Sequence, residues 1–435
     1  MTNPTQHIFE IMALGAEGDG IANLNDASIY IPFALPGEMV TLKSPPRSIG
    51  KGNASGELAT VENPSPARID PVCQHFGVCG GCRLQHISSG EIERHKMQTL
   101  AQALSRKSLI PNTINETVSA PLHTRRRARF DFRRQKGKSV FGFKQRRSHD
   151  GIDLKMCPVL TPKLEALVPE LRGLLNRLPA LSGGGGVQVT ETLTGFDIVI
   201  SPTKNTDLNL KQREILAAWC DEHDIARLCW DDGDGPLPVA ARHPAQVMFG
   251  DVLVDLPVQA FLQPSADGEA LLAGLVGKAI SDHCRRPKRI ADLFSGCGSL
   301  SLPAASATGA IVDTFDIDDG MVAAQRNAAN RHNPALRVTA TKRDLFNKPL
   351  MPAELKPYDA VIFDPPKAGA ASQAAELAAS KVPLVIAVSC NPSTLARDLR
   401  LLVDGGYTLI SSTPVDQFTW SGQLEAVAVL TKQVK

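Results

Sequence analysis

The chain has 435 residues, a formal net charge of +2, and 43% hydrophobic and 21% charged residues. This composition is typical of a folded globular protein, and the length is typical of two or three domains. The net charge is too small to attract a nucleic acid by itself, so such a partner would need a local basic patch. No apolar run approaches the roughly 18 residues of a membrane span, and no basic leader precedes an apolar segment at the start. We therefore expect a cytoplasmic protein that does not contact a membrane, and we expect a monomer.

Residues 1–65 predict a small β-barrel similar to an OB fold, because short strands alternate with turn residues. The expected strands are 8–13, 28–33, 38–43 and 57–62. Lys43, Arg47 and Lys51 lie on loops of this part, where they either face solvent or meet phosphate.

Residues 66–255 form the expected central part, with mixed α and β structure. It begins with Cys73, Cys79 and Cys82, and a later Cys157 before Pro158 can supply a fourth ligand. Four thiolates suit either a structural zinc ion or an iron–sulfur cluster, and the single trailing Cys-Pro favours the cluster. Four further cysteines are not spaced like metal ligands, and we expect them in the core: Cys220, Cys229, Cys284 and Cys297.

A dense basic segment lies between residues 121 and 147. It has eight arginines and three lysines against one acid, Asp131. The basic residues are Arg125, Arg126, Arg127, Arg129, Arg133, Arg134, Lys136, Lys138, Lys144, Arg146 and Arg147. Phenylalanines alternate with these charges, which predicts a hairpin with one apolar and one charged face. The charged face is either a solvated surface or a site for RNA phosphates, and this density of one sign favours RNA.

Residues 256–435 show alternating strands and helices, which predicts an α/β fold with a doubly wound, largely parallel sheet covered on both faces. The expected strands are 289–294, 311–317, 337–340, 360–364, 384–389, 408–413 and 426–430. The expected helices are 299–308, 321–331, 372–380 and 393–403. The last two strands have no helix between them, so we expect an antiparallel hairpin at one edge.

A glycine turn, Ser295-Gly296-Cys297-Gly298, follows the first of these strands, and Asp316 lies at the end of the second strand. Glycines let the backbone approach a ligand, and a carboxylate one strand later can accept hydrogen bonds from ribose. The turn lacks the third glycine of the dinucleotide fingerprint, which, with Asp364-Pro365-Pro366, favours S-adenosylmethionine over NAD. Asp344 and Asp364 follow the third and fourth strands, where each is either a helix cap or a ligand-facing group.

Cys390 ends the fifth strand before Asn391-Pro392, so we expect its thiol in the same crevice. Uracil C5 is a poor nucleophile, but a thiolate that adds to C6 turns C5 into an enolate carbon able to attack a methyl sulfonium. A base must then take the C5 proton, and Glu425, before the last strand, is the candidate. The alternatives are a buried core thiol for Cys390 and a solvated carboxylate for Glu425.

With these motifs the chain resembles the RNA 5-methyluridine methyltransferases, specifically the ribosomal-RNA members with an N-terminal TRAM domain and a 4Fe-4S cluster. The resemblance lies in the stretches Cys79–His86, Phe261–Gln263, Asp292–Gly296, Asp364–Gly369 and Ser389–Asp398. It implies a Rossmann-like class I methyltransferase domain in which Cys390 is the nucleophile and Glu425 the base. It implies four cluster ligands, Cys73, Cys79, Cys82 and Cys157. It also implies that the S-adenosylmethionine site is lined by Gln263, Phe294, Ser299, Asp316, Asp344 and Asp364.

One stretch departs from the family pattern, which carries Pro-His-Thr and His-x-Glu before and at its glutamate. Here the stretch reads Phe418-Thr419-Trp420-Ser421-Gly422-Gln423-Leu424-Glu425. The glutamate is kept and the histidines are absent. This difference affects the expected rate of the reaction, the path of the C5 proton and the choice of substrate. It does not change the expected reaction class.

These observations predict S-adenosylmethionine-dependent methylation of uridine C5 in RNA, with 23S ribosomal RNA as the expected substrate. Two alternatives stay open. A tRNA uridine-C5 methyltransferase would share every catalytic residue. A non-catalytic RNA-binding or ribosome assembly factor would keep the basic segment and would not need Cys390.

Overall fold

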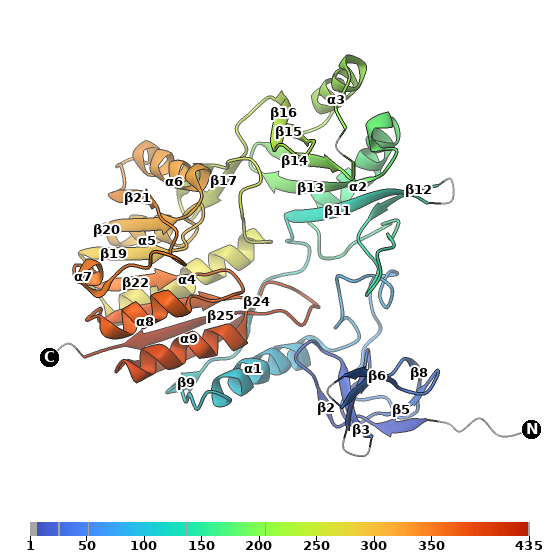
Figure 1. Ribbon diagram of the computed structural model, residues 1–435, viewed down its shortest axis with the longest axis horizontal. Coiled ribbons are helices and arrows are strands. Elements are labelled where there is room, and N and C mark those ends of the chain that lie inside the picture. Colours follow the sequence, from blue (N-terminus) through green and yellow to red (C-terminus); the bar gives the residue numbers. More distant parts are fainter. Residues whose placement is uncertain (1–6, 25–26, 51, 136–137, 205, 434–435) are drawn as a thin grey trace, which may run out of the picture.

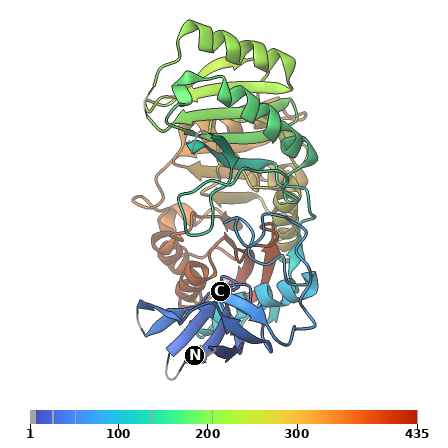
Figure 2. The ribbon, with the colours of Figure 1, turned by 90° about the vertical axis from the view of Figure 1, so that its right-hand side faces the viewer.

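The computed structural model describes residues 7–24, 27–50, 52–135, 138–204 and 206–433. Lys51 and Lys136, two of the basic residues named above, lie outside these ranges. The chain forms a strand-rich N-terminal part, a central sheet and a larger C-terminal sheet (Figure 1). Figure 2 shows the N-terminal strands and the central sheet at opposite ends of the molecule, and Figure 1 shows the C-terminal sheet to one side of both.

The N-terminal part holds two small sheets, with the orders β1-β5-β8 and β2-β3-β4-β7-β6. Their strands are β1 (Ile8–Glu10), β2 (Ala13–Leu14), β3 (Gly20–Leu24), β4 (Ala27–Ile31), β5 (Met39–Leu42), β6 (Arg47–Gly50), β7 (Asn53–Ser55) and β8 (Leu58–Val61). Ile11, Ile29, Ile31 and Val40 are buried in one core between the two sheets. The strand-rich character expected for this part is confirmed, and its assignment as a TRAM-type barrel stays a prediction.

The central sheet has the order β12-β11-β13-β14-β15-β16. Its strands are β11 (Arg127–Gln135), β12 (Lys138–Gly142), β13 (Gly185–Thr192), β14 (Gly195–Pro202), β15 (Ile225–Asp231) and β16 (Pro236–Ala241). It packs against α2 (Pro162–Asn176), a 3-10 turn η1 (Pro179–Leu181) and α3 (Leu210–Glu222), and a separate pair, β17 (Gln246–Phe249) with β18 (Val252–Asp255), follows.

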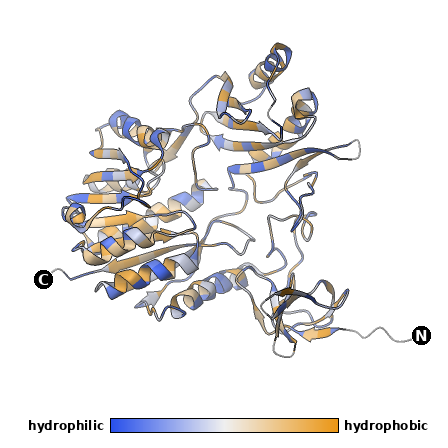
Figure 3. Cartoon of the chain, in the orientation of Figure 1, coloured by the Kyte–Doolittle hydropathy of each residue, from blue (hydrophilic) through white to orange (hydrophobic). Residues whose placement is uncertain are grey.

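The basic segment forms the predicted hairpin of β11 and β12. Phe130 and Phe132 are buried in the core, whereas Arg129 and Arg133, which alternate with them on the same strand, are exposed and half-buried, respectively. The alternation of apolar and charged faces is therefore confirmed, and blue positions interrupt β11 in Figure 3.

The C-terminal sheet has nine strands in the order β10-β24-β25-β23-β22-β19-β20-β21, with β9 also paired to β24. The strands after residue 256 are β19 (Arg289–Leu293), β20 (Ile311–Asp316), β21 (Val338–Lys342), β22 (Ala360–Phe363), β23 (Leu384–Ser389), β24 (Thr408–Asp416) and β25 (Glu425–Thr431). The helices are α4 (Ala266–His283), α5 (Ser301–Thr308), α6 (Asp319–Arg331), α7 (Pro352–Leu355), α8 (Ala371–Ala379) and α9 (Pro392–Asp404). Apolar cores lie on both faces of the sheet, which confirms the predicted α/β class with a Rossmann-like arrangement.

An earlier part of the chain completes this sheet. After the cysteine loop come α1 (Ser89–Ser105), β9 (Thr113–Ile114) and β10 (Val118–Ser119). α1 packs on α9 and β24, and β9 and β10 pair with β24 in parallel. The expected β24–β25 hairpin forms, but its outer strand is not an edge, because these two short strands cover it.

No helix in the described part of the chain is both long and apolar enough to cross a membrane.

A buried ion pair fixes α1 to the sheet. The Lys96 ammonium lies 2.5 Å from the Asp416 carboxylate, and the side chains are 1% and 6% exposed. We expect Lys96→Met to lower the free energy of unfolding by about 3–5 kcal/mol, because it leaves Asp416 buried without a partner. Urea unfolding measures this, with Lys278→Met as the control, since the exposed Lys278–Asp282 pair contributes at most about 1 kcal/mol. Equal stability of the two variants would contradict the prediction.

Candidate active site

A cavity of about 880 Å³ lies at the carboxyl ends of the parallel strands of the C-terminal sheet. Open α/β sheets bind ligands at this edge because strand ends and loops converge there. The structure brings all of the predicted cofactor and catalytic residues to this cavity: Gln263, Phe294, Ser299, Asp316, Asp344, Asp364, Cys390 and Glu425.

The glycine turn after β19 forms one wall of the cavity. Phe294, Gly296 and Gly298 all have positive φ angles, of 61°, 55° and 91°. A Cβ atom on Gly298 would lie 2.9 Å from Leu302 Cγ, so the turn has no room for a side chain there. The Asp316 carboxylate accepts a hydrogen bond of 2.8 Å from the Gly296 amide, which holds the turn against the end of β20.

A second wall follows β21. The Asp344 carboxylate accepts hydrogen bonds from the Phe346 amide (3.0 Å) and the Asn347 side-chain amide (2.6 Å), so it orders its own loop as well as lining the cavity. The Phe346 ring lies 5.3 Å from the Phe294 ring, centroid to centroid, and it is 44% exposed. Two aromatic faces therefore border the cavity next to carboxylates, which suits a ligand with a flat ring and hydroxyl groups. Sequence reasoning missed Phe346, although an aromatic residue so close to a strand-end acid was a usable signal.

Strand order brings the three reactive groups together. β23 lies between β22 and β25, so Cys390, directly after β23, has Asp364 after β22 on one side and Glu425 at the start of β25 on the other. Burial raises the pKa of both carboxyls, and the charge of Asp364 raises the pKa of Glu425 further because two negative charges are unfavourable in a buried site. Glu425 Oε2 is buried without a hydrogen-bond partner in the described chain.

The thiol of Cys390 is half-buried, and burial, followed by the charges of Glu425 and Asp364, raises its pKa to about 11. Lys367 is the cation that acts in the opposite direction and lowers the pKa of this thiol. Its backbone carbonyl also accepts hydrogen bonds from the side chains of Asn391 (3.1 Å) and Thr394 (3.2 Å), which fixes the loop of Lys367 to the residues after Cys390. Lys367 lies within the stretch Asp364–Gly369, and sequence reasoning gave its charge no role.

Part of the basic segment reaches the same cavity. Arg125, Arg127 and Arg129 line it from the side of the central sheet. The Arg127 guanidinium donates to the Leu262 carbonyl (3.3 Å) and lies 5.8 Å from the centroid of the exposed Phe261 ring. The cavity is therefore bordered by carboxylates on the sheet side and by guanidinium groups on the opposite side.

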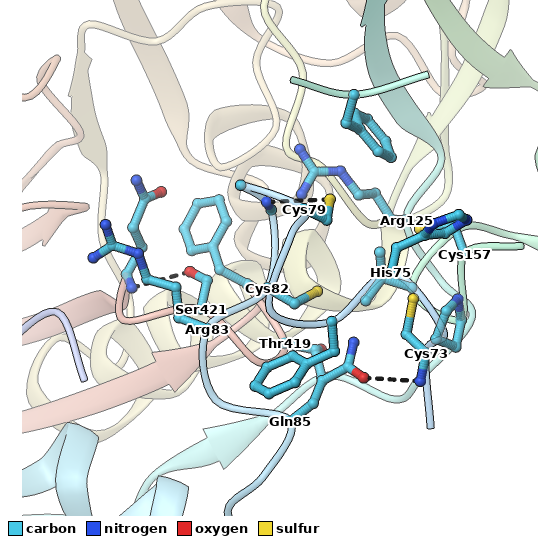
Figure 4. Close-up of a pocket in the computed structure, with 18 of the residues that line it drawn as sticks. Cys73, His75, Cys79, Cys82, Arg83, Gln85, Arg125, Cys157, Thr419 and Ser421 are labelled. Atoms are coloured by element: carbon cyan, nitrogen blue, oxygen red, sulfur yellow. Dashed lines mark hydrogen bonds between the residues drawn. The ribbon is translucent and has the colours of Figure 1, made fainter. Parts of the chain in front are cut away.

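The four thiols proposed as metal ligands meet in a second cavity, of about 460 Å³. Cys73, Cys79, Cys82 and Cys157 all line it, and Figure 4 shows their sulfur atoms around a common space. Gln85 helps to shape the loop, since its side-chain oxygen accepts a hydrogen bond of 3.1 Å from the Cys73 amide. Within the described residues, no three side chains of Cys, His, Asp or Glu converge closely enough to hold a single metal ion.

The other cysteines divide into two kinds. Cys220 and Cys229 are buried in the fold, as expected, whereas Cys284 is only partly buried against a core. Cys297 is also buried, but it lines the active-site cavity in the glycine turn. Cys297 is therefore buried as expected, but it also borders the active-site cavity.

The departing stretch 418–424 separates the two cavities. Phe418 and Gln423 line both of them, as does Arg125. The Trp420 carbonyl accepts hydrogen bonds from the backbone amides of Arg83 (2.7 Å) and Leu84 (2.9 Å), so the cysteine loop is bonded directly to the segment that leads to Glu425.

The fold and the cavity define a class I methyltransferase, and comparisons with known proteins agree. Residues 251–433 match the family described as tRNA (Uracil-5-)-methyltransferase. An uncharacterized RNA methyltransferase of Brucella suis biovar 1 is 40% identical over 99% of this chain and 99% of its own. The 23S rRNA (uracil(1939)-C(5))-methyltransferase RlmD of Edwardsiella ictaluri is 32% identical over 96% of this chain and 93% of that protein.

The tRNA (uracil-54, C5)-methyltransferase of Pyrococcus abyssi, solved in complex with S-adenosyl-L-homocysteine, has the same fold. Its TM-score is 0.75 at 20% identity, and the match covers 98% of this chain and 99% of that one. Since relatives at 30% identity or more span nearly the whole chain, the protein belongs to the family of RNA uracil-C5 methyltransferases, which use S-adenosylmethionine.

The charge of Lys367 should control the reactivity of Cys390. The thiolate is the reactive form, so Lys367→Met, which removes the cation that lowers the thiol pKa, should slow alkylation at neutral pH. We expect a decrease of about tenfold for each pKa unit, measured as the rate of iodoacetamide labelling of the Cys390 peptide by mass spectrometry. Lys381→Met, at an exposed lysine outside the cavity, is the control. Equal labelling rates in both variants would show that Lys367 does not act on the thiol.

Proposed function

We propose that this enzyme methylates C5 of a uridine in 23S ribosomal RNA through a covalent bond between Cys390 Sγ and C6 of the base. The observation that carries the proposal is the meeting of Cys390, Asp364 and Glu425 at one end of β23, in the cavity that also holds the predicted cofactor residues. An RNA-binding or assembly factor without catalysis would have no need for this arrangement.

The proposed steps balance with these groups. The Cys390 thiolate adds to C6, and the C5=C6 double bond becomes an enolate. C5 then attacks the methyl group of S-adenosylmethionine, so that a C–C bond forms, the S–CH3 bond breaks and S-adenosylhomocysteine leaves. The Glu425 carboxylate takes the C5 proton, and the C6–S bond breaks to return the thiolate and 5-methyluridine.

RNA must bring the target base out of its stack, which costs a few kcal/mol. The guanidinium groups of Arg125, Arg127 and Arg129 line the side of the cavity opposite the carboxylates, where a phosphate backbone could be held. The exposed face of β11 continues this charge away from the cavity. Ribosomal RNA is favoured over tRNA because the relative named as a 23S rRNA enzyme is 32% identical to this chain, whereas the solved tRNA enzyme is 20% identical.

We further propose that Cys73, Cys79, Cys82 and Cys157 hold a 4Fe-4S cluster. The support is the shared cavity and the all-thiol donor set, which suits iron–sulfur chemistry. When bound, such a cluster would crosslink the loop 73–82 to the segment around residue 157. In this chain it would stand behind the stretch 418–424, which forms the wall toward the active site.

The covalent step can be trapped with RNA that carries 5-fluorouridine, because fluorine cannot leave as a proton. We expect the wild type with a 23S rRNA fragment to form a methylated protein–RNA adduct that survives a denaturing gel, and Cys390→Ala to form none. Glu425→Gln should accumulate the adduct with ordinary uridine and lose about 10²- to 10⁴-fold in turnover. Glu222→Gln, at an exposed position on α3, is the matched control.

Two results would contradict the proposal at different levels. An adduct with tRNA transcripts and not with 23S fragments would keep the chemistry and change the substrate. No adduct with either RNA, while the protein still binds 23S rRNA, would favour the assembly factor. Mapping of 5-methyluridine in rRNA and tRNA of a deletion strain gives an independent answer.

The cluster is tested by metal content. Protein purified without oxygen should contain about four iron and four sulfide per chain, and Cys82→Ser should lose both. Cys284→Ser, at a cysteine outside the second cavity, should keep them. Stoichiometric zinc without sulfide would replace the cluster with a structural zinc site.

A further inference from the structure

Gln417 is a buried glutamine, 5% exposed, directly after the end of β24 and directly before the stretch that departs from the family pattern. It does not line the active-site cavity but stands behind it, between that cavity and the cysteine cavity. None of the roles assigned above uses this side chain.

The amide of Gln417 contacts two groups that do line the active site. Its Nε2 donates a hydrogen bond of 2.7 Å to Oε1 of Gln263. The second group is the Glu425 carboxyl, which begins β25 opposite Val415, two residues before Gln417. The contact with the Gln417 amide lowers the pKa of this carboxyl. An NH2 group has two hydrogens, so one nitrogen can serve both acceptors.

The orientation of this amide follows from its surroundings. Its carbonyl side faces the first turn of α4, where a Cβ on Gly268 would lie 2.6 Å from Gln417 Oε1. The N-terminus of a helix carries partial positive charge, which favours the oxygen on this side, where it has no hydrogen-bond donor among the described residues. The NH2 group then faces Gln263. Gly268 is thus needed for Gln417 to reach its place.

The consequence for Gln263 is a defined amide orientation. Because its Oε1 accepts from Gln417, its Nε2 is the group left to donate to a ligand in the cavity, and Nε2 has no partner among the described residues. A donor at this point suits an acceptor such as the carboxylate of the methyl donor.

We propose that Gln417 is a positioning residue that joins the base Glu425 to Gln263 and sets which end of the Gln263 amide faces the methyl donor. The inference rests on the proposed function, since it assigns Glu425 as the base. It identifies a glutamine outside the cavity as a control on both proton removal and cofactor binding.

The sign of the expected pH effect follows from the groups around Glu425. Asp364 from the end of β22 raises its pKa, Lys367 from the next loop lowers it, and Cys390 faces it from the end of β23. Gln417 adds a donor that favours the ionised carboxylate. Loss of this donor raises the pKa, so the decline of activity on the acid side should begin at a higher pH.

The test compares Gln417→Met, which has similar length and no donor, with the wild type on the same RNA. We expect the acid limb of the kcat profile to move up by about half to one pH unit, because a donor to the ionised form is lost. We expect KM for S-adenosylmethionine to rise roughly fivefold, the effect of one missing hydrogen bond. Decay of the methylated adduct in a single turnover should slow in the same pH range.

Gln417→Glu keeps the shape and adds a second negative charge, so its acid limb should move further than that of Gln417→Met. The control is Gln373→Met, because Gln373 is another buried glutamine that bonds only the Leu350 backbone, away from the cavity. It should lose stability and keep the wild-type pH profile and KM.

An unchanged acid limb and KM in both Gln417 variants would overturn the inference while the wild type remains active. If Gln417→Met does not fold, the shift in Gln417→Glu decides alone. Failure of the proposed function is distinguishable, because the wild type itself would then form no adduct with fluorinated RNA.

Discussion

The active site depends on one electrostatic constraint, the close placement of Asp364, Glu425 and Cys390 in a partly desolvated cavity. Each group becomes negative when it loses its proton, and each makes ionisation of the others harder. Strand order imposes this crowding, because β23 has β22 on one side and β25 on the other. Lys367 and the Gln417 amide are the described groups that oppose it. A sulfonium ion in the cavity would add a further positive charge, so the methyl donor itself would favour the ionised forms that the reaction requires.

The segment from Gln417 to Glu425 is where the three regions of the molecule meet. The cysteine loop bonds to the Trp420 carbonyl, and a Cβ on Gly422 would lie 2.8 Å from Cα of Glu17 in the N-terminal part. Glu17 also pairs with Arg83 of the cysteine loop at 2.7 Å. Two of these contacts, at Trp420 and Gly422, are made through backbone atoms and do not need the histidines of the family pattern.

Sequence reasoning was most successful where position along the chain decides position in space. The carboxyl ends of parallel strands share one edge of a sheet. The sequence alone therefore placed the acids and the thiol at those strand ends together. The roles of Lys367, Gln417 and Phe346 depend instead on the direction of side chains and on partners far away in the chain. The hydrogen bond between Gln417 and Gln263 joins residues that are 154 positions apart, so no local sequence pattern predicts it. The hairpin of β24 and β25 was predicted, but its cover was not, because strands of two residues such as β9 and β10 show no alternation.

The cover of β24 by β9 and β10 also bears on how the protein can be divided. The backbone groups of β24 that these strands satisfy would be exposed in a fragment that starts near residue 256, and Asp416 would lose Lys96. Such a fragment would present a free sheet edge, which is a template for aggregation. Because the covering strands are made nearly 300 residues before β24, they stay without their partner until β24 has left the ribosome.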